Sequence, residues 1–157
     1  MNKKSIIFNS IIAGLAALVV LVMLLPIDIE GEFSVFSLAQ AFMAQEDGLI
    51  LALPLFFAFA SAIIILIFAI LTLLTVCNVI KSAKAGKAFK IVSLVFACIS
   101  TLFTAAVFAM FMSQGALLVG LLISALLFVA MIVLISIDLA QSKSFNKNVE
   151  PSQENPQ

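Results

Sequence analysis

Asp138 is the residue with the most chemical potential in this sequence, because it is the only carboxylate inside a long hydrophobic segment. It lies near the C-terminal end of a predicted helix, where the helix dipole disfavours a negative charge. We therefore expect a lysine to pair with it, with Lys81 or Lys143 as the favoured partner. Two alternatives are an interfacial anion that meets water and an ion or proton site, since intramembrane ionisable groups usually mark function.

Other polar residues are expected at the same depth as Asp138. Helical rise, counted from the basic ends of the hydrophobic segments, places them within about two turns of one end. The candidate polar layer consists of Asn9, Asn78, Ser93 and Asp138. The chain has no His and no Arg, so the commonest acid–base catalyst and the best anion ligand are both missing. We expect neither enzymatic activity nor a metal or cofactor.

The two cysteines, Cys77 and Cys98, are too far apart in sequence to form a CxxC redox motif. Both fall in the half of the predicted membrane domain that borders the reducing cytoplasm. We expect them to be packing residues.

Four apolar segments must position these residues. Apolar residues make up 64% of the chain, well above the roughly 45–50% of soluble domains. About 20 apolar residues suffice for a helix to cross a membrane. The sequence therefore predicts an all-α integral membrane protein with a four-helix domain over residues 1–140, followed by a disordered tail over 141–157. The expected spans are 6–25, 49–80, 91–112 and 116–139.

Lysines and acidic residues alternate between the connecting segments. All eight basic residues are lysines that precede the first span, separate the second from the third, or follow the fourth. The loop 26–48 has five acidic residues and no lysine. Short Lys-rich loops stay in the cytoplasm, so we expect a multi-pass protein of the plasma (cytoplasmic) membrane with both termini cytoplasmic. The Lys-only, Ile- and Phe-rich composition fits an AT-rich bacterial genome.

The extracytoplasmic loop 26–48 is acidic at both ends and apolar in its middle. Residues 33–44 predict a short amphipathic helix, too short to span and suited to the membrane surface. One interpretation is a lid packed on the outer end of the bundle. The other is a docking face for an extracytoplasmic partner, formed by Val35, Leu38 and Phe42.

The predicted cytoplasmic loop 81–90 spaces its lysines three residues apart. Its role in fixing the orientation explains the charge, but contact with anionic lipids is an alternative, because each lysine near such a surface contributes about 1 kcal/mol. Gly86 is expected to end the second helix or act as a hinge. The candidate lipid contacts are Lys81, Lys84, Lys87 and Lys90.

Small residues recur every four positions in the spans. That spacing lets helix backbones approach closely within a membrane. We expect packing inside the bundle, with an interface to a second copy or a partner subunit as the alternative. The candidate helix-packing residues are Gly14, Ala97, Thr101, Ala105, Ala109, Gly120 and Ser124.

These features favour a small non-enzymatic protein that acts through helix–helix and loop contacts. We expect an accessory, regulatory or protective subunit of a larger membrane complex. The alternative is a small homo-oligomeric transporter or channel that uses the polar layer. The expected partners are the lipid bilayer and a membrane protein or a second copy of the chain; a net charge of zero gives no reason to expect nucleic acid.

Overall fold

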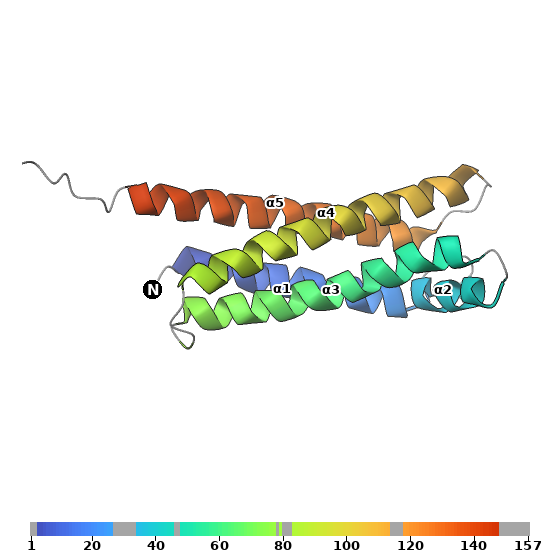
Figure 1. Ribbon diagram of the computed structural model, residues 1–157, viewed down its shortest axis with the longest axis horizontal. Coiled ribbons are helices and arrows are strands. Elements are labelled where there is room, and N and C mark those ends of the chain that lie inside the picture. Colours follow the sequence, from blue (N-terminus) through green and yellow to red (C-terminus); the bar gives the residue numbers. More distant parts are fainter. Residues whose placement is uncertain are drawn as a thin grey trace, which may run out of the picture.

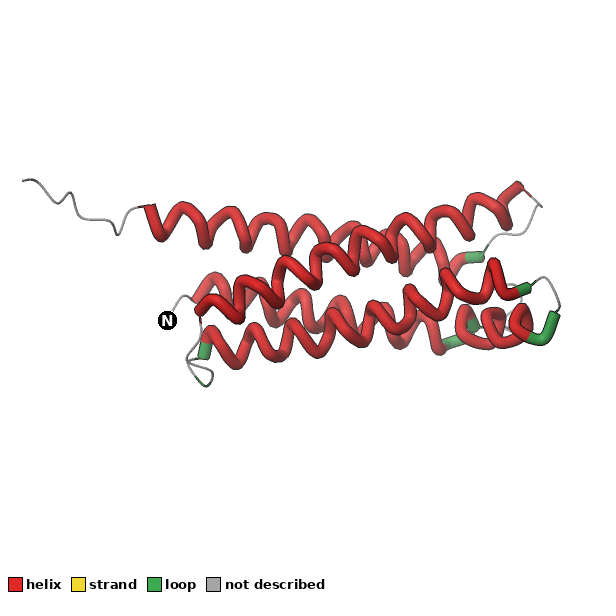
Figure 2. Tube along the Cα trace, viewed as in Figure 1, coloured by secondary structure: helices red, strands yellow, loops and turns green. Residues whose placement is uncertain are grey.

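The computed structural model describes residues 3–26, 34–45, 48–77, 79, 83–113 and 118–147, and every regular element within these ranges is an α-helix. Four of the described helices are long and apolar enough to cross a membrane, whereas α2 is short (Figures 1 and 2). The prediction of an all-α chain with four potential spans is thus confirmed. The helices are α1 (Lys3–Leu24), α2 (Val35–Met43), α3 (Leu49–Val76), α4 (Ala83–Ser113) and α5 (Val119–Lys147).

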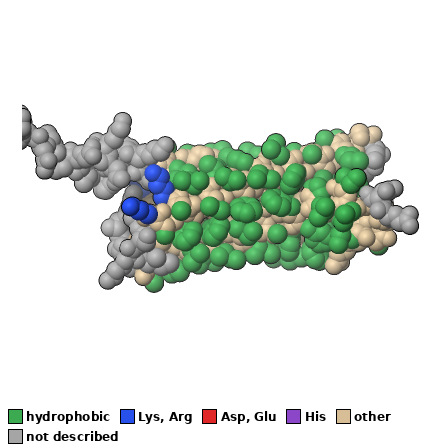
Figure 3. Space-filling model, in the orientation of Figure 1, with side chains coloured by type: hydrophobic (Ala, Val, Ile, Leu, Met, Phe, Trp, Pro, Cys, Tyr) green, Lys and Arg blue, Asp and Glu red, His purple; other side chains and the backbone are tan. Residues whose placement is uncertain are grey.

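The four long helices form an antiparallel bundle. Helix α1 packs beside α3 and α5, and α4 packs beside the same two helices (Figure 1). Successive long helices run in opposite directions, as in other up-down-up-down bundles. The start of α1, the end of α3, the start of α4 and the end of α5 therefore meet, at the left of Figure 1. The basic side chains visible in Figure 3 gather there, so we call it the basic end and its opposite the α2 end.

Helix α4 begins eight residues earlier than the sequence predicts. The expected loop 81–90 is helical from Ala83 onward, so its lysines from Lys84 to Lys90 belong to the first turns of α4. Lysine and alanine are good helix formers, and one internal glycine costs only about 1 kcal/mol. The Lys-rich segment is therefore a continuation of the span rather than a loop.

The other helix ends also differ from the expected bounds. Helix α3 ends at Val76, with Cys77 as its C-cap, and not at residue 80. Helix α5 continues to Lys147, so the expected disordered tail is helical over its first seven residues, 141–147. Residues 148–157 lie outside the described part of the chain. Helical hydrogen bonding does not depend on an apolar surrounding, so a span can extend past its apolar residues.

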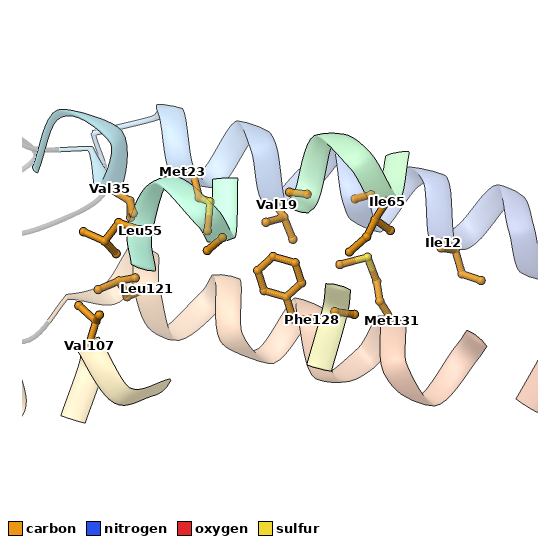
Figure 4. Close-up of a cluster of buried hydrophobic side chains, with 14 of the residues drawn as sticks. Ile12, Val19, Met23, Val35, Leu55, Ile65, Val107, Leu121, Phe128 and Met131 are labelled. Atoms are coloured by element: carbon orange, nitrogen blue, oxygen red, sulfur yellow. The ribbon is translucent and has the colours of Figure 1, made fainter. Parts of the chain in front are cut away.

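The core of the bundle is narrow. Phe128 of α5 is fully buried, and Figure 4 shows its ring facing Val19 of α1, with Ile65 and Met131 beside it. Several alanines are fully buried as well, among them Ala16, Ala58, Ala62 and Ala97. Only 28–33% of each span is buried, and the outward-facing side chains are mostly large and apolar, as the space-filling view shows (Figure 3). Such an exterior suits contact with lipid.

Helix α2 packs against α3 and α1 at the α2 end. Its N-terminus is held by a capping box: the Ser34 hydroxyl accepts a hydrogen bond from the Ser37 backbone N–H at 3.0 Å, and the Ser37 hydroxyl accepts one from the Ser34 N–H at 2.9 Å. The Phe36 ring contacts Phe56 and Phe59 of α3, with ring centroids 5.6 and 5.2 Å apart. Aromatic contacts thus attach the short helix to the bundle.

Candidate functional site: a buried polar network

Asp138 faces the interior of the bundle. It follows Phe128, Met131 and Ile135 on the inward side of α5, at steps of three and four residues that keep one helix face. The residue is only 3% exposed. A carboxylate this buried must be matched by donors, since an unpaired buried charge is very costly.

Lys90 of α4 supplies the opposite charge. Its Nζ lies 2.6 Å from Asp138 Oδ2, and its side chain is 11% exposed. Lys90 precedes Ser93, Ala97 and Ser100 on the buried side of α4, again at steps of three and four. The continuation of α4 to Ala83 thus turns this lysine toward the interior.

Helix α1 contributes an amide and a hydroxyl to the same carboxylate. Asn9 Nδ2 donates to Asp138 Oδ2 at 3.0 Å and to the Ser5 carbonyl oxygen, one turn earlier, at 2.7 Å. The Ser5 hydroxyl donates to Asp138 Oδ1 at 3.3 Å. Asn9 is 2% exposed and lies on the same helix face as Ile12 and Ala16.

Together these four residues form a polar network that joins three helices at the basic end. Both carboxylate oxygens of Asp138 accept hydrogen bonds, and one of them also meets the ammonium of Lys90. The pair carries no net charge. The network can orient α1, α4 and α5 relative to one another, because its contacts are directional.

The predicted polar layer is present in part. The structure joins Asn9 directly to Asp138, and Ser93 is buried one turn from Lys90 on α4. Asn78 lies outside the described residues. Neither Ser5 nor Lys90 was assigned to the layer from sequence, although Ser5 precedes Asn9 by four residues and Lys90 precedes Ser93 by three, spacings that share a helix face.

The prediction that a lysine pairs with Asp138 is confirmed, but the partner is Lys90. Lys81 and the side chain of Lys143 lie outside the described part of the structure. Lys90 was expected to contact lipid, and that is wrong, since its ammonium is engaged inside the bundle. Lys84 and Lys87 are exposed, and their contact with lipid stays a prediction.

Gly86 allows α3 and α4 to approach closely at the basic end. A Cβ atom at this position would lie 2.6 Å from the Thr75 hydroxyl oxygen of α3. The expectation that Gly86 ends a helix or acts as a hinge is therefore wrong, because it lies inside α4 and packs against α3. Glycine is needed at this position because a larger residue would collide with the Thr75 side chain.

The small-residue stripe predicted on α4 only partly faces the interior. Ala97 is fully buried and Thr101 is half-buried, whereas Ala105 and Ala109 are exposed. Each four-residue step turns about 40° beyond a full circle in a helix of 3.6 residues per turn, so the stripe rotates off the contact face. Ser100, Thr104 and Val107 occupy that face instead.

The helix-packing residues on the other spans divide in the same way. Gly120 and Ser124 of α5 are buried, as expected of residues that pack within the bundle. Gly14 of α1 is exposed, and a Cβ atom there would meet nothing within 4 Å. The expectation that Gly14 packs against another helix of the bundle is wrong.

The predicted docking face of α2 packs against the bundle itself. Val35 is 2% exposed, and Leu38 and Phe42 are partly buried against the core. The Phe42 ring also lies 5.7 Å from that of Phe111 on α4. These three residues therefore fit the lid interpretation, and they are not available as an external docking face in this structure.

The cysteines lie on the surface of the bundle. Cys77 and Cys98 are both free and exposed, so their expected role in packing is wrong. Within the described ranges, no group of three or more His, Cys, Asp or Glu side chains could hold a metal ion.

Comparison of the chain with protein-family models, with curated proteins and with solved structures finds no significant match.

Proposed function

We propose that this chain is a multi-pass protein of the cytoplasmic membrane that works without catalysis, as an accessory, regulatory or protective subunit of a larger membrane complex. The observation that carries this proposal is that the two charged side chains brought together inside the described bundle, Asp138 and Lys90, are paired with each other. Asp138 is neutralised by Lys90 and hydrogen-bonded by Asn9 and Ser5. A carboxylate paired in this way can hold three helices in a fixed arrangement, which supports a structural role for Asp138.

In the proposed orientation the basic end faces the cytoplasm and the α2 end faces outward. The lysine distribution supports it, because Lys-rich segments are retained on the cytoplasmic side. The amphipathic helix α2 then covers the extracytoplasmic end of the bundle. Cysteine accessibility would test this orientation: in intact cells, a membrane-impermeant thiol reagent should label Gln40→Cys in a background with Cys77 and Cys98 replaced, and should not label Lys84→Cys.

The surface left for a partner is the outward-facing side of the long helices. Photo-crosslinking residues placed at exposed Leu102 and Leu126 should capture one defined membrane polypeptide in native membranes, whereas the same probe at buried Phe128 should not. The complex purified after mild solubilisation should contain that polypeptide in fixed stoichiometry. A homodimer that moves ions across reconstituted vesicles would contradict the accessory role.

A transporter or channel remains the second candidate, and one observation favours it. Ser93, Ser100 and Thr104 form a buried row of hydroxyls on the face of α4 that begins with Lys90. Ion flux into vesicles separates the two functions. Transport through this row would be abolished by Asp138→Asn, whereas an accessory subunit gives no flux in either form.

Contact with anionic lipid is proposed for Lys84 and Lys87, which are exposed near the start of α4. Two such lysines would contribute about 2 kcal/mol at a strongly anionic surface. The double substitution of both residues by Gln should reduce the enrichment of anionic over zwitterionic lipid bound to the purified protein. Replacement of exposed Gln40 at the α2 end is the matched control and should leave the enrichment unchanged.

A further inference from the structure

Two hydroxyl groups in the middle of the bundle have no hydrogen-bond partner among the described residues. They belong to Ser61 of α3 and Ser100 of α4, both fully buried. Two other buried hydroxyls bond within their own helix: Thr104 donates to the Ser100 carbonyl at 2.8 Å, and Ser124 donates to the Gly120 carbonyl at 2.8 Å. The lack of a partner at Ser61 and Ser100 is therefore unusual, because buried polar groups are nearly always hydrogen-bonded.

The contact between Gly86 and Thr75 fixes the level at which the two serines lie. Ser61 precedes Thr75 by 14 residues on α3, and Ser100 follows Gly86 by 14 residues on α4. In antiparallel helices these equal steps lead to the same level, about 21 Å from the contact. Fourteen residues also make about 3.9 turns, so each serine faces nearly the same way as the residue at the contact.

Aromatic contacts between α3 and α4 support this alignment. Phe68 stacks on Phe89 on the basic side of the two serines, and Phe57 stacks on Phe96 with ring centroids 6.1 Å apart. Phe57 also meets Phe103, at 5.3 Å. The level of Ser61 and Ser100 falls between the Phe68–Phe89 contact and the Phe57–Phe103 contact, and the Phe57–Phe96 contact crosses it.

The side chains next to the serines are small. Ala58 and Ala62 flank Ser61 on α3, and Ala97 lies one turn from Ser100 on α4, all fully buried. A buried water needs a polar location with two to four hydrogen-bonding groups and enough room. Two serine hydroxyls, each able both to donate and to accept, meet the polar requirement, and the alanines limit the bulk around them.

We propose that Ser61 and Ser100 bind a buried water molecule that bridges α3 and α4 at the middle of the bundle. The water satisfies both hydroxyls and gives the apolar interior a directional contact at mid-depth. It fixes the register of α3 against α4, whose remaining contacts at this level are apolar. The site is independent of the proposed accessory function.

Stability measurements give the first test. If water bridges the hydroxyls, Ser61→Ala and Ser100→Ala should each lower the thermal midpoint in detergent by about 2–4 °C. The double variant should fall no further than the worse single variant, because either change already breaks the bridge. If the hydroxyls are simply unsatisfied, each alanine should raise the midpoint, and that result would overturn the proposal, as would strictly additive losses.

Nuclear magnetic resonance of the full chain in micelles gives a second, independent test. With methyl-labelled alanine, an Overhauser effect from water to the Ala58, Ala62 or Ala97 methyl groups is expected in the unsubstituted protein and should vanish in the double variant. Ser124→Ala, which removes a locally bonded hydroxyl, is the matched control and should retain the signal. Absence of the signal in the unsubstituted protein, or a high-resolution structure with the two hydroxyls bonded to each other, contradicts the bound water.

Discussion

The two ends of the bundle are held together by different interactions. At the basic end, one carboxylate joins α1, α4 and α5 through an ion pair and hydrogen bonds. At the α2 end, phenylalanine rings attach α2 to α3 and α4 without any charged group among the described residues. Hydrogen bonds and ion pairs depend on individual atoms, whereas ring packing depends on volume. Charge substitutions should therefore affect mainly the basic end, and changes of shape mainly the α2 end.

The largest effect is expected from Asp138→Asn. This change keeps the shape of the side chain but leaves the ammonium of Lys90 buried without a counter-charge. Loss of one partner from a buried pair typically costs about 3–5 kcal/mol, and we expect a decrease of this size in the free energy of unfolding, measured by reversible denaturation in mixed micelles. If the Lys90 ammonium moves toward the lipid headgroups, the decrease in the free energy of unfolding is smaller.

The matched control is the double variant Asp138→Asn, Lys90→Gln, which removes both charges of the pair. Replacement of a buried ion pair by neutral residues can be nearly neutral, so the double variant should recover most of the lost stability. Equal stability of the single variant and the unsubstituted protein would show that the ion pair does not hold the basic end together.

Glycine substitutions test shape at both ends. A Cβ atom at Gly48, between α2 and α3, would overlap the Phe42 carbonyl oxygen, which belongs to the backbone. Overpacking of this kind costs about 1–3 kcal/mol, so Gly48→Ala should destabilise the α2 end, measured as faster hydrogen exchange in α2.

At Gly86 the obstructing group is the Thr75 side chain, which can be shortened. Gly86→Ala should therefore be rescued by Thr75→Ala, as measured by the free energy of unfolding. No truncation of a side chain should rescue Gly48→Ala. If the Thr75 substitution gives no rescue, the close approach of α3 and α4 has another cause.

A smaller effect is expected from Ser34→Ala, which removes the N-cap of α2. Loss of a serine cap costs about 1 kcal/mol. Hydrogen exchange should accelerate at the first turn of α2, while the polar network at the basic end remains protected. Acceleration at both ends would mean that they unfold as one unit and would remove the contrast between them.

The smallest effect, and one of opposite sign, is expected from Gly14→Ala. No atom lies within 4 Å of a Cβ at this position, and alanine favours a helix over glycine by up to about 1 kcal/mol. The free energy of unfolding should rise slightly. A clear decrease in a native complex but not in the isolated chain would identify Gly14 as a contact with a partner.

The sequence was sufficient to predict the helices but not how each one is rotated about its axis. Four apolar segments predicted the spans, and the position of Asp138 predicted a lysine partner. The sequence does not identify Lys90 as that partner, because the Lys-rich segment 81–90 predicts a loop, and a loop assigns its lysines to no helix face. Ala105 and Ala109 were misplaced because a spacing of four residues differs from the 3.6-residue turn of a helix.

The role of α2 could not be derived from its own residues. Val35, Leu38 and Phe42 form an apolar face in either the lid or the docking interpretation. The choice depends on whether Phe56, Phe59 and Phe111 come close enough to cover that face, which is a property of the tertiary arrangement. A local pattern cannot contain this information.

The hydrogen bond between Asn9 and Asp138 connects residues 129 positions apart in the chain. Among the described helices, α1 is therefore synthesised well before α5 supplies the carboxylate for its buried amide. A nascent chain that stops after α4 has the charge of Lys90 but not its counter-charge. The network can therefore close only after α5 has been synthesised.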